Sequence, residues 1–363
     1  MKPYSYLKRY NEISRQILLD LIEKESDKNV IVSPLSIMSM LDIAADSVSG
    51  DAKNEVTNYI SGIGNNNISN VLNDLQKIIT YTGELTSANA VIISEKIRDK
   101  VKKEYIDTVK NKHDADVISS NNIVKDVNEW VSDKTKGMIN KIADDSMNQM
   151  LIALINAISF MADWDDDYED DDIYPDEFTN RDGSVSEVEM MDSTEYSYIE
   201  NDYFSGFTKD YKGGNYCYMA LLPRLKSKTF LKKAIEKSDL TKMFWDSEST
   251  EVRVIMPEFK AEFSKNMNAI LESNGVKKIF DNLADFSPVS NDVPLKMESI
   301  LHKAYIEVDR RGTRASAVTL GVVVAGCAPM DDFKMVELNR PFLYAIVNKI
   351  TGFPVFIGIV ENL

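Results

Sequence analysis

Residues Arg310–Asp332 read RRGTRASAVTLGVVVAGCAPMDD, and no charged residue occurs between Arg314 and Asp331. The whole chain is 28% charged, so a run of this length stands apart. Alternate residues of a strand face the same side. One face of this segment would therefore carry only small side chains, those of Thr313, Ala315, Ala317 and Thr319. The segment predicts a strand that needs a sheet to enter, because left unpaired it would be prone to aggregate.

Composition limits the classes of partner. The chain has 363 residues, 44% of them hydrophobic, as in a globular protein. Its formal net charge of −16 disfavours nucleic acid and anionic membranes as partners. Cys217 and Cys327 are its only cysteines, so no disulfide framework is expected. The first residues run directly into a helical pattern without the apolar core of a signal peptide.

Hydrophobic periodicity predicts helices early in the chain and strands late. Helices are expected at 11–22, from Ser33 and Pro34 onward, and at 66–82, 97–110, 127–142 and 261–279. Strands are expected at 29–32, 88–93, 151–160, 216–222, 252–256, 295–308, 342–347 and 354–359. The last two strands are joined by a hairpin signal at 348–352. This order predicts an α+β fold with several antiparallel sheets.

Few side chains could act in catalysis or bind a metal. The run 163–172 is acidic at eight of ten positions, but it lacks the glycine and glutamate spacing of a calcium loop and is expected to be a solvated loop. The two histidines, His113 and His302, lie far apart, and neither stands near Cys327 in sequence. His302 lies in an apolar strand and is expected to be a hydrogen-bonded core residue. The sequence predicts neither an enzyme nor a metal site.

The chain resembles the serpin family along essentially its whole length, and residues 1–363 are expected to form a single serpin domain. The matching motifs occur in the family's order: Asn29–Ile37 (NVIVSPLSI), Asn128, Trp130, Val131, Thr135, Gly137 and Ile139, then Asn156, Ala157, Phe160 and Trp164, then Leu221–Pro223, Met256, Pro257 and Phe259, His302–Ala304, Asn339–Phe342 and Phe356–Gly358. The resemblance implies three β-sheets, about eight or nine helices, and an exposed reactive-centre loop at about 310–332.

The resemblance also implies a mechanism that needs no catalytic group and no cofactor. In inhibitory serpins a protease cleaves the loop, and the part before the cut inserts as a new strand into the main sheet while the enzyme is still bound as an acyl-enzyme. Four residues here correspond to the family's cluster beneath that sheet, where the sheet parts: Ser33, Ser36, Asn156 and His302. We refer to them as the parting cluster.

The small hinge residues are typical of an inhibitory serpin, but the charged residues around the hinge differ in sign from those of the family. Five residues correspond to the hinge: Gly312, Thr313, Ala315, Ala317 and Thr319. The family has acidic residues around this glycine, whereas this chain has Arg310, Arg311 and Arg314. The family's lysine in the Met-Pro-Lys-Phe turn is Glu258 here. Because the charges of both residues are reversed relative to the family, we expect Glu258 to pair with Arg310. The pair would lie near Trp164 at the top of the sheet, in the region called the breach in this family.

Counting fourteen residues beyond Gly312, as the family does, places the cleaved bond at Gly326–Cys327, with Val324 and Ala325 as neighbouring candidates. All four residues are small and apolar, which predicts an elastase-like serine protease trapped in a covalent complex. The protein is expected to be monomeric and extracellular, with a cytoplasmic location left open. The alternative is a noninhibitory serpin that acts as a carrier or chaperone-like binding protein. An inhibitor of intracellular cysteine proteases would need an acidic residue at the bond, which is lacking.

Overall fold

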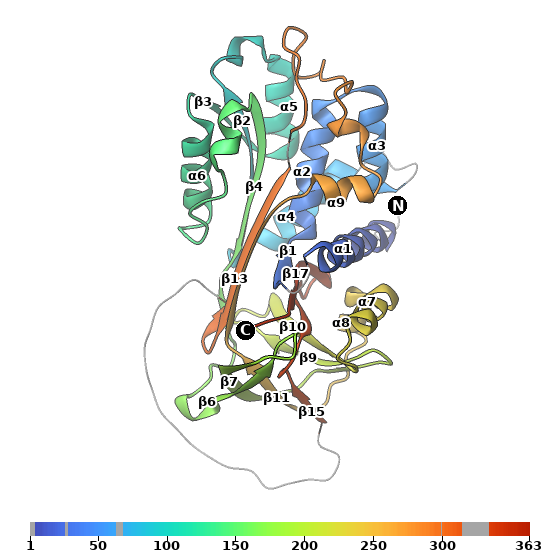
Figure 1. Ribbon diagram of the computed structural model, residues 1–363, viewed down its shortest axis with the longest axis vertical. Helices are drawn as coiled ribbons and strands as arrows, with labels where there is room; N and C mark the ends of the chain where they lie inside the picture. Colours follow the sequence, from blue (N-terminus) through green and yellow to red (C-terminus); the bar gives the residue numbers. More distant parts are fainter. Residues whose placement is uncertain (1–3, 26–27, 63–67, 299, 314–333) are drawn as a thin grey trace. The chain divides into compact units, whose positions relative to one another are not determined.

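The computed structural model describes residues 4–25, 28–62, 68–298, 300–313 and 334–363 (Figure 1). Within this described part the chain forms nine α-helices and three β-sheets. The helices are α1 (Tyr4–Lys24), α2 (Pro34–Ser47), α3 (Gly50–Ser61), α4 (Ile68–Thr80), α5 (Lys103–His113), α6 (Ile123–Lys134), α7 (Lys228–Lys237), α8 (Leu240–Trp245) and α9 (Asn268–Ser273).

The strands concentrate in the second half of the chain, as the periodicity predicts. They are β1 (Val30–Val32), β2 (Leu85–Ser94), β3 (Asp116–Ser120), β4 (Ile152–Phe160), β5 (Ala162–Asp163), β6 (Ile173–Thr179), β7 (Val185–Glu195), β8 (Tyr198–Glu200), β9 (Phe204–Asp210), β10 (Tyr216–Pro223), β11 (Val252–Pro257), β12 (Phe259–Asn266), β13 (Leu301–Asp309), β14 (Gly312–Thr313), β15 (Lys334–Glu337), β16 (Phe342–Asn348) and β17 (Phe353–Val360).

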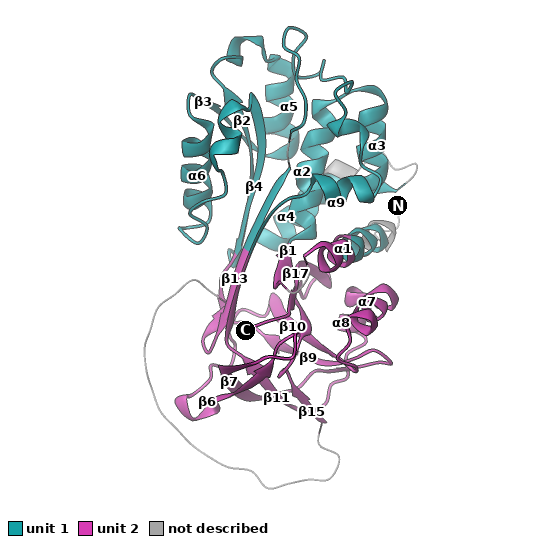
Figure 2. Cartoon of the chain, in the orientation of Figure 1, with its two compact units in different colours: residues 1–16, 33–159, 263–304 teal, residues 17–32, 160–262, 305–363 magenta. Residues whose placement is uncertain are grey.

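The chain divides into two compact units (Figure 2). Unit 1 comprises residues 1–16, 33–159 and 263–304, and it contains helices α2 to α6 and α9. Unit 2 comprises residues 17–32, 160–262 and 305–363, and it contains α7, α8 and two of the three sheets.

Unit 2 is built on a six-stranded sheet in the order β1-β17-β16-β10-β9-β8. Its centre is the antiparallel hairpin β16–β17, which the sequence predicts from two apolar runs and an intervening turn. Both strands are buried along their whole length because their residues are almost all apolar. A second sheet, in the order β15-β11-β7-β6, completes the strand-rich part of the unit.

The third sheet has the order β3-β2-β4-β13-β14-β5, and β12 pairs with β13. Strand β4 is an apolar run that is buried from Ala153 to Phe160, as expected of a strand covered on both faces. It lies parallel to β13, with Ile155 opposite Leu301. The two-residue strand β14 lies between β13 and β5. This sheet brings the first hinge residues next to the strands that flank them.

Helix α2 forms the buried centre of unit 1. Ser33 caps its start, accepting a hydrogen bond from the backbone N–H of Ser36, and Pro34 occupies the first helical position, where no N–H is needed. All of its residues except Asp46 are buried, which explains why its sequence, PLSIMSMLDIAADS, is apolar on nearly every side. Helix α2 therefore supplies the framework on which the polar groups of unit 1 are placed.

The prediction of one helix over 261–279 is wrong in its first third. Residues Phe259, Ala261 and Phe263 are buried and alternate with exposed neighbours, so this segment has the two-residue period of a strand and forms β12. Only Asn268–Ser273 is α-helical. Some boundaries also differ: the helix expected at 97–110 begins at Lys103, that at 127–142 ends at Lys134, and the strand expected at 295–308 begins at Leu301. Helices α3, α7 and α8 were not predicted.

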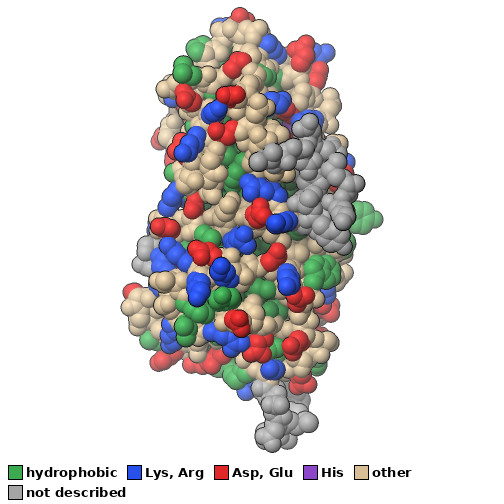
Figure 3. Space-filling model, turned by 90° about the vertical axis from the view of Figure 1, so that its right-hand side faces the viewer, with side chains coloured by type: hydrophobic (Ala, Val, Ile, Leu, Met, Phe, Trp, Pro, Cys, Tyr) green, Lys and Arg blue, Asp and Glu red, His purple; other side chains and the backbone are tan. Residues whose placement is uncertain are grey.

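The surface mixes charges of both signs. On the face shown in Figure 3, acidic and basic side chains are interspersed over the described residues. In the described part of the chain, no helix has both the length and the apolar character needed to cross a bilayer.

Candidate functional site

The structure brings together three of the four residues of the parting cluster in unit 1. The backbone N–H of Ser33 donates to His302 Nε2 at 3.3 Å, and Ser33 Oγ accepts from the N–H of Ser36 at the same distance. Ser33 stands at the start of α2 and His302 lies in β13, so the contact joins the buried helix to the third sheet. The side chain positions follow from the cap of α2 and from the register of β13.

The fourth residue, Asn156, lies in β4 and donates through Nδ2 to Asn89 Oδ1 at 2.9 Å. Asn89 belongs to β2, and sequence reasoning missed it. Its one signal was a polar residue inside an apolar strand. The buried oxygens Asn156 Oδ1 and Ser36 Oγ accept no hydrogen bond from the described residues. The cluster therefore consists of two separate hydrogen-bonded groups rather than one closed network.

His302 is a neutral core residue. Because Nε2 accepts a hydrogen bond, the single proton of the neutral ring belongs on Nδ1. Burial lowers the pKa of His302 to about 4, since the charged imidazolium would lose its hydration. The sequence prediction of a buried, hydrogen-bonded histidine is confirmed, and this environment suits neither a general base near neutral pH nor a metal ligand.

Trp164 anchors the chain immediately before the hinge, within unit 2. Its ring stacks on Tyr211, with centroids 4.6 Å apart and an angle of 10° between the planes. Its Nε1 donates to the carbonyl of Asp309 at 2.8 Å, and its backbone N–H donates to the carbonyl of Arg311 at 2.8 Å. Trp164 therefore holds the end of β13 and the residues that follow it.

The first two hinge residues are already part of the sheet. Thr313 pairs with Val308 of β13 on one side and with Ala162 of β5 on the other, and its exposed fraction is 1%. Its Oγ1 lies 2.6 Å from the hydroxyl of Tyr211. Gly312 has φ of +155°, and a Cβ there would lie 2.1 Å from the carbonyl oxygen of Ala162, so only glycine fits.

The remaining loop residues named from the sequence lie outside the described residues. They are Ala315, Ala317 and Thr319 of the hinge, and Val324, Ala325, Gly326 and Cys327 at the predicted bond.

The reversed pair is present. Arg310 Nε donates to Glu258 Oε1 at 2.8 Å, and the backbone N–H of Arg310 donates to the same oxygen at 3.1 Å. The side chains are 37% and 24% exposed, so water screens the pair in part. One carboxylate thus binds both the side chain and the backbone of Arg310.

A buried lysine completes the surroundings of Trp164. Lys209 Nζ contacts Glu195 Oε1 at 2.7 Å and lies 4.6 Å from the ring centre of Tyr168 and 5.6 Å from that of Trp164. Burial raises the pKa of Glu195, although the lysine opposes the shift. No local pattern indicated this arrangement, because Lys209 and Glu195 come from two separate strands, and Trp164 and Tyr168 come from the acidic run.

The acidic run 163–172 is anchored by its two aromatic residues. Trp164 and Tyr168 are buried, whereas Asp165–Asp167 and Glu169–Asp171 are exposed. The prediction of a solvated acidic loop is therefore confirmed. Among the described residues, no group of three or more His, Cys, Asp or Glu side chains is arranged to hold a metal ion.

A family model described as Serpin (serine protease inhibitor) matches residues 8–363. The chain belongs to the serpin family. It is 30% identical to serine proteinase inhibitor 1 of vaccinia virus (strain Western Reserve), over 94% of this chain and 98% of that protein. Iripin-1 of Ixodes ricinus is 26% identical, over 95% of this chain and 92% of that protein.

The fold agrees with solved serpins. The native state of tengpin, a thermophilic serpin, is 31% identical and matches with a TM-score of 0.85, over 100% of this chain and 95% of that one. Thyroxine-binding globulin in complex with thyroxine also matches with a TM-score of 0.85, over 99% of this chain and 98% of that one. At 22% identity, that second likeness shows the fold alone. The prediction of a serpin fold with three sheets and eight or nine helices is confirmed.

A charge-swap series tests the pair formed by Glu258 and Arg310. Arg310→Glu should lower the free energy of unfolding by about 1 kcal/mol or less, because the pair is partly exposed. Glu258→Lys should cost more, since it also removes the acceptor of the Arg310 backbone N–H. The double variant should recover part of the loss in denaturant unfolding. If adding Glu258→Lys to Arg310→Glu recovers nothing, the pair does not stabilise the fold.

The lowered pKa of His302 predicts a dependence of stability on pH. The pKa of His302 is about 4 in the folded protein and 6.5, its ordinary value, in the unfolded chain. His302 therefore does not weaken the fold above pH 6.5, but the free energy of unfolding falls as the pH drops from 6.5 toward about 4. The loss should approach about 3 kcal/mol relative to His302→Gln, whose amide oxygen can still accept from Ser33. Denaturant unfolding between pH 7 and pH 4 measures this difference. Parallel curves for the two proteins would contradict the assignment.

Proposed function

We propose that this protein is a suicide-substrate inhibitor of elastase-like serine proteases. Cleavage of the loop would allow the hinge to enter the third sheet between β13 and β4, with the protease still attached as an acyl-enzyme. The relatives that carry the name serine proteinase inhibitor support protease inhibition in general. The elastase preference and the details of the mechanism are our own inference.

The observation that carries the proposal is the position of Thr313. Its side chain is buried in the third sheet and is hydrogen-bonded to Tyr211, so the first step of strand addition requires no new burial at this residue. The residues that would follow on the same face, Ala315, Ala317 and Thr319, are small enough to enter the same layer. Backbone hydrogen bonds to both neighbouring strands would then drive further insertion.

The elastase preference rests on the residues around the predicted bond. Val324, Ala325, Gly326 and Cys327 are all small and apolar, and none could occupy the acidic specificity pocket of a trypsin-like enzyme. We place the bond at Gly326–Cys327, with cleavage after Val324 or Ala325 as the neighbouring choices. Cys327 has no part in catalysis in this proposal, since the protease supplies the nucleophile.

The noninhibitory alternative is a carrier or a chaperone-like binding protein. The fold does not separate the two functions, because thyroxine-binding globulin shares it. The small hinge face favours inhibition, since a charged or bulky residue there would stop strand insertion. We further propose that the protein acts outside cells as a monomer, because an elastase-like target is an extracellular enzyme. A cytoplasmic location remains the competing proposal.

Incubation with pancreatic or neutrophil elastase tests the proposed target. We expect a covalent complex that survives SDS electrophoresis, and a released peptide whose mass places the cut at Gly326–Cys327 or one or two residues before it. Trypsin should form no such complex at this bond. Cleavage by elastase without any complex would contradict inhibition and favour the noninhibitory alternative.

A hinge variant tests strand insertion directly. Ala317→Arg places a charged side chain on the hinge face that insertion would bury, and we expect at least a tenfold rise in the number of inhibitor molecules consumed per protease inhibited. Ser316→Arg is the matched control, because alternation places residue 316 on the opposite face of the hinge. Equal stoichiometry for the two variants would contradict a role for the Thr313 face in inhibition.

A further inference from the structure

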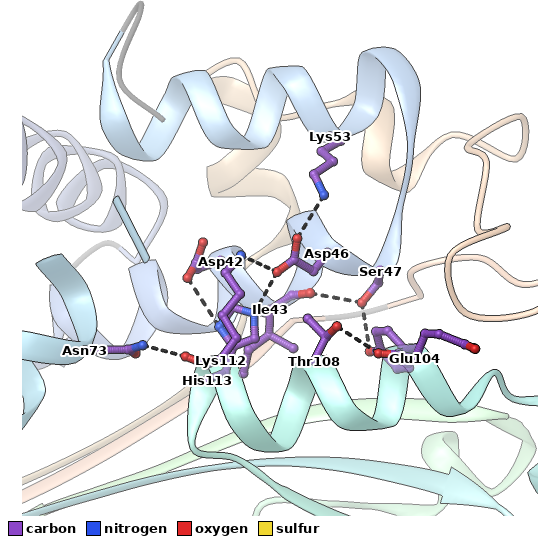
Figure 4. A network of polar contacts seen from close by, with 11 residues as sticks. Asp42, Ile43, Asp46, Ser47, Lys53, Asn73, Glu104, Thr108, Lys112 and His113 are labelled. Carbon is purple, nitrogen blue, oxygen red and sulfur yellow. Dashed lines mark hydrogen bonds and ion pairs between the residues drawn. The ribbon is translucent and has the colours of Figure 1, made fainter. Parts of the chain in front are cut away.

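His113 has no role in the proposed inhibition. It is, however, the most buried member of a cluster of five ionisable residues in unit 1 (Figure 4). It is the last residue of α5, and its side chain is 3% exposed. Its ring lies between two carboxylates of α2. Nδ1 is 3.3 Å from Asp42 Oδ2, and Nε2 is 2.9 Å from Asp46 Oδ2. One ring therefore joins the end of α5 to two successive turns of α2.

The other charged groups of the cluster all contact Asp46. Lys112 of α5 lies 2.5 Å from Asp46 Oδ2, and Lys53 of α3 lies 2.9 Å from Asp46 Oδ1. Helix α4 contributes an uncharged group, since Asn73 Nδ2 donates to the carbonyl of Lys112. Two lysines thus neutralise Asp46 whatever the charge of His113, whereas the contact with Asp42 adds a second carboxylate to the ring.

With both carboxylates ionised, the arrangement favours a protonated ring. An imidazolium donates from both nitrogens, so it can bond to Asp42 and Asp46 at once. A neutral imidazole keeps one N–H, so one of its nitrogens must turn a lone pair toward a carboxylate oxygen about 3 Å away. Neither choice of tautomer satisfies both carboxylates. The contact is also favoured in the charged form because His113 stands at the carboxyl end of a helix.

We infer that His113 is a proton-controlled latch between α2 and α5, closed when the ring is charged and weakened when it is neutral. His113 contacts the C-terminal half of α2, whereas Ser33 of the parting cluster caps the N-terminal end of the same helix. The latch goes beyond the proposed inhibition and does not depend on it.

The sign of the pH effect follows from the contacts. Burial alone would lower the pKa of His113, but the hydrogen bonds to Asp42 and Asp46 outweigh it and raise the pKa above 6.5. The stabilisation by the latch is therefore complete below pH 6.5 and is lost as the pH rises through the pKa in the folded protein. His302 behaves in the opposite way, since its neutral form is the stable one.

A second link between the same helices provides a control. Tyr105 of α5 and Ser47 of α2 share a hydrogen bond of 2.9 Å between their hydroxyls. Burial raises the pKa of Tyr105 to about 12, so this link keeps one protonation state over the range in which His113 titrates. Tyr105→Phe thus removes a contact between α2 and α5 that does not respond to pH.

NMR titration of the imidazole signals tests the charge state, and only two histidines contribute to the spectrum. One should titrate above pH 6.5 and vanish in His113→Gln, while the other remains neutral at that pH. Asp42→Asn should lower the pKa of His113 by about one pH unit or more, and Lys53→Met should raise it. A pKa of His113 at or below 6.5, or no change in Asp42→Asn, would overturn the latch.

Hydrogen exchange of the amides in the last turn of α5 tests the mechanical consequence. In the wild type, protection should fall at least about tenfold beyond the intrinsic rise in exchange as the pH passes the pKa of His113. His113→Gln should show no such step. Tyr105→Phe should lower protection at every pH but keep the step. A step that persists in His113→Gln, or one that is lacking in the wild type, would refute the inference.

Discussion

One strand position between β13 and β5 governs the arrangement around the hinge. Gly312 and Thr313 occupy it, and each depends on its surroundings for a different reason. Gly312 passes so close to the carbonyl of Ala162 that no side chain fits, and Thr313 buries a hydroxyl that needs the partner it finds in Tyr211. Trp164 then fixes the backbone on the other side of the glycine. These contacts set the point from which any further strand addition must start.

The sequence predicted the structure wherever the signal for an element lies within that element's own residues. The apolar runs of β4, β16 and β17 and the capped start of α2 were predicted because their signals lie within a few residues. The pair formed by Glu258 and Arg310 was predicted across a separation of 52 residues, because both residues depart from the family pattern with the sign of their charge reversed. The segment that forms β12 was misjudged, because eight residues with the two-residue period of a strand were read together with the helix that follows them.

The contacts that no local pattern revealed are long-range. Asn89 meets Asn156, Tyr211 meets Thr313, and Lys209 meets Glu195 only after the sheets have formed. A hydroxyl, an amide or a lysine in a strand gives no indication of which distant residue will face it. The two histidines illustrate the same limit. The two side chains are chemically identical, yet burial without a charged partner lowers the pKa of His302, whereas contacts with two carboxylates raise the pKa of His113.

The arginines before the hinge have a consequence for attack by other enzymes. Arginine is the residue that trypsin-like proteases prefer, so Arg310 and Arg311 would offer two cleavable bonds ahead of the proposed reactive bond. Here the carbonyl of Arg310 accepts a hydrogen bond from the N–H of Tyr168, and that of Arg311 accepts one from Trp164. A protease must take a peptide bond in extended form into its own cleft, which requires these bonds to open first. Tyr168 and Trp164 thus protect the peptide bonds that follow Arg310 and Arg311 from proteases that cleave after arginine.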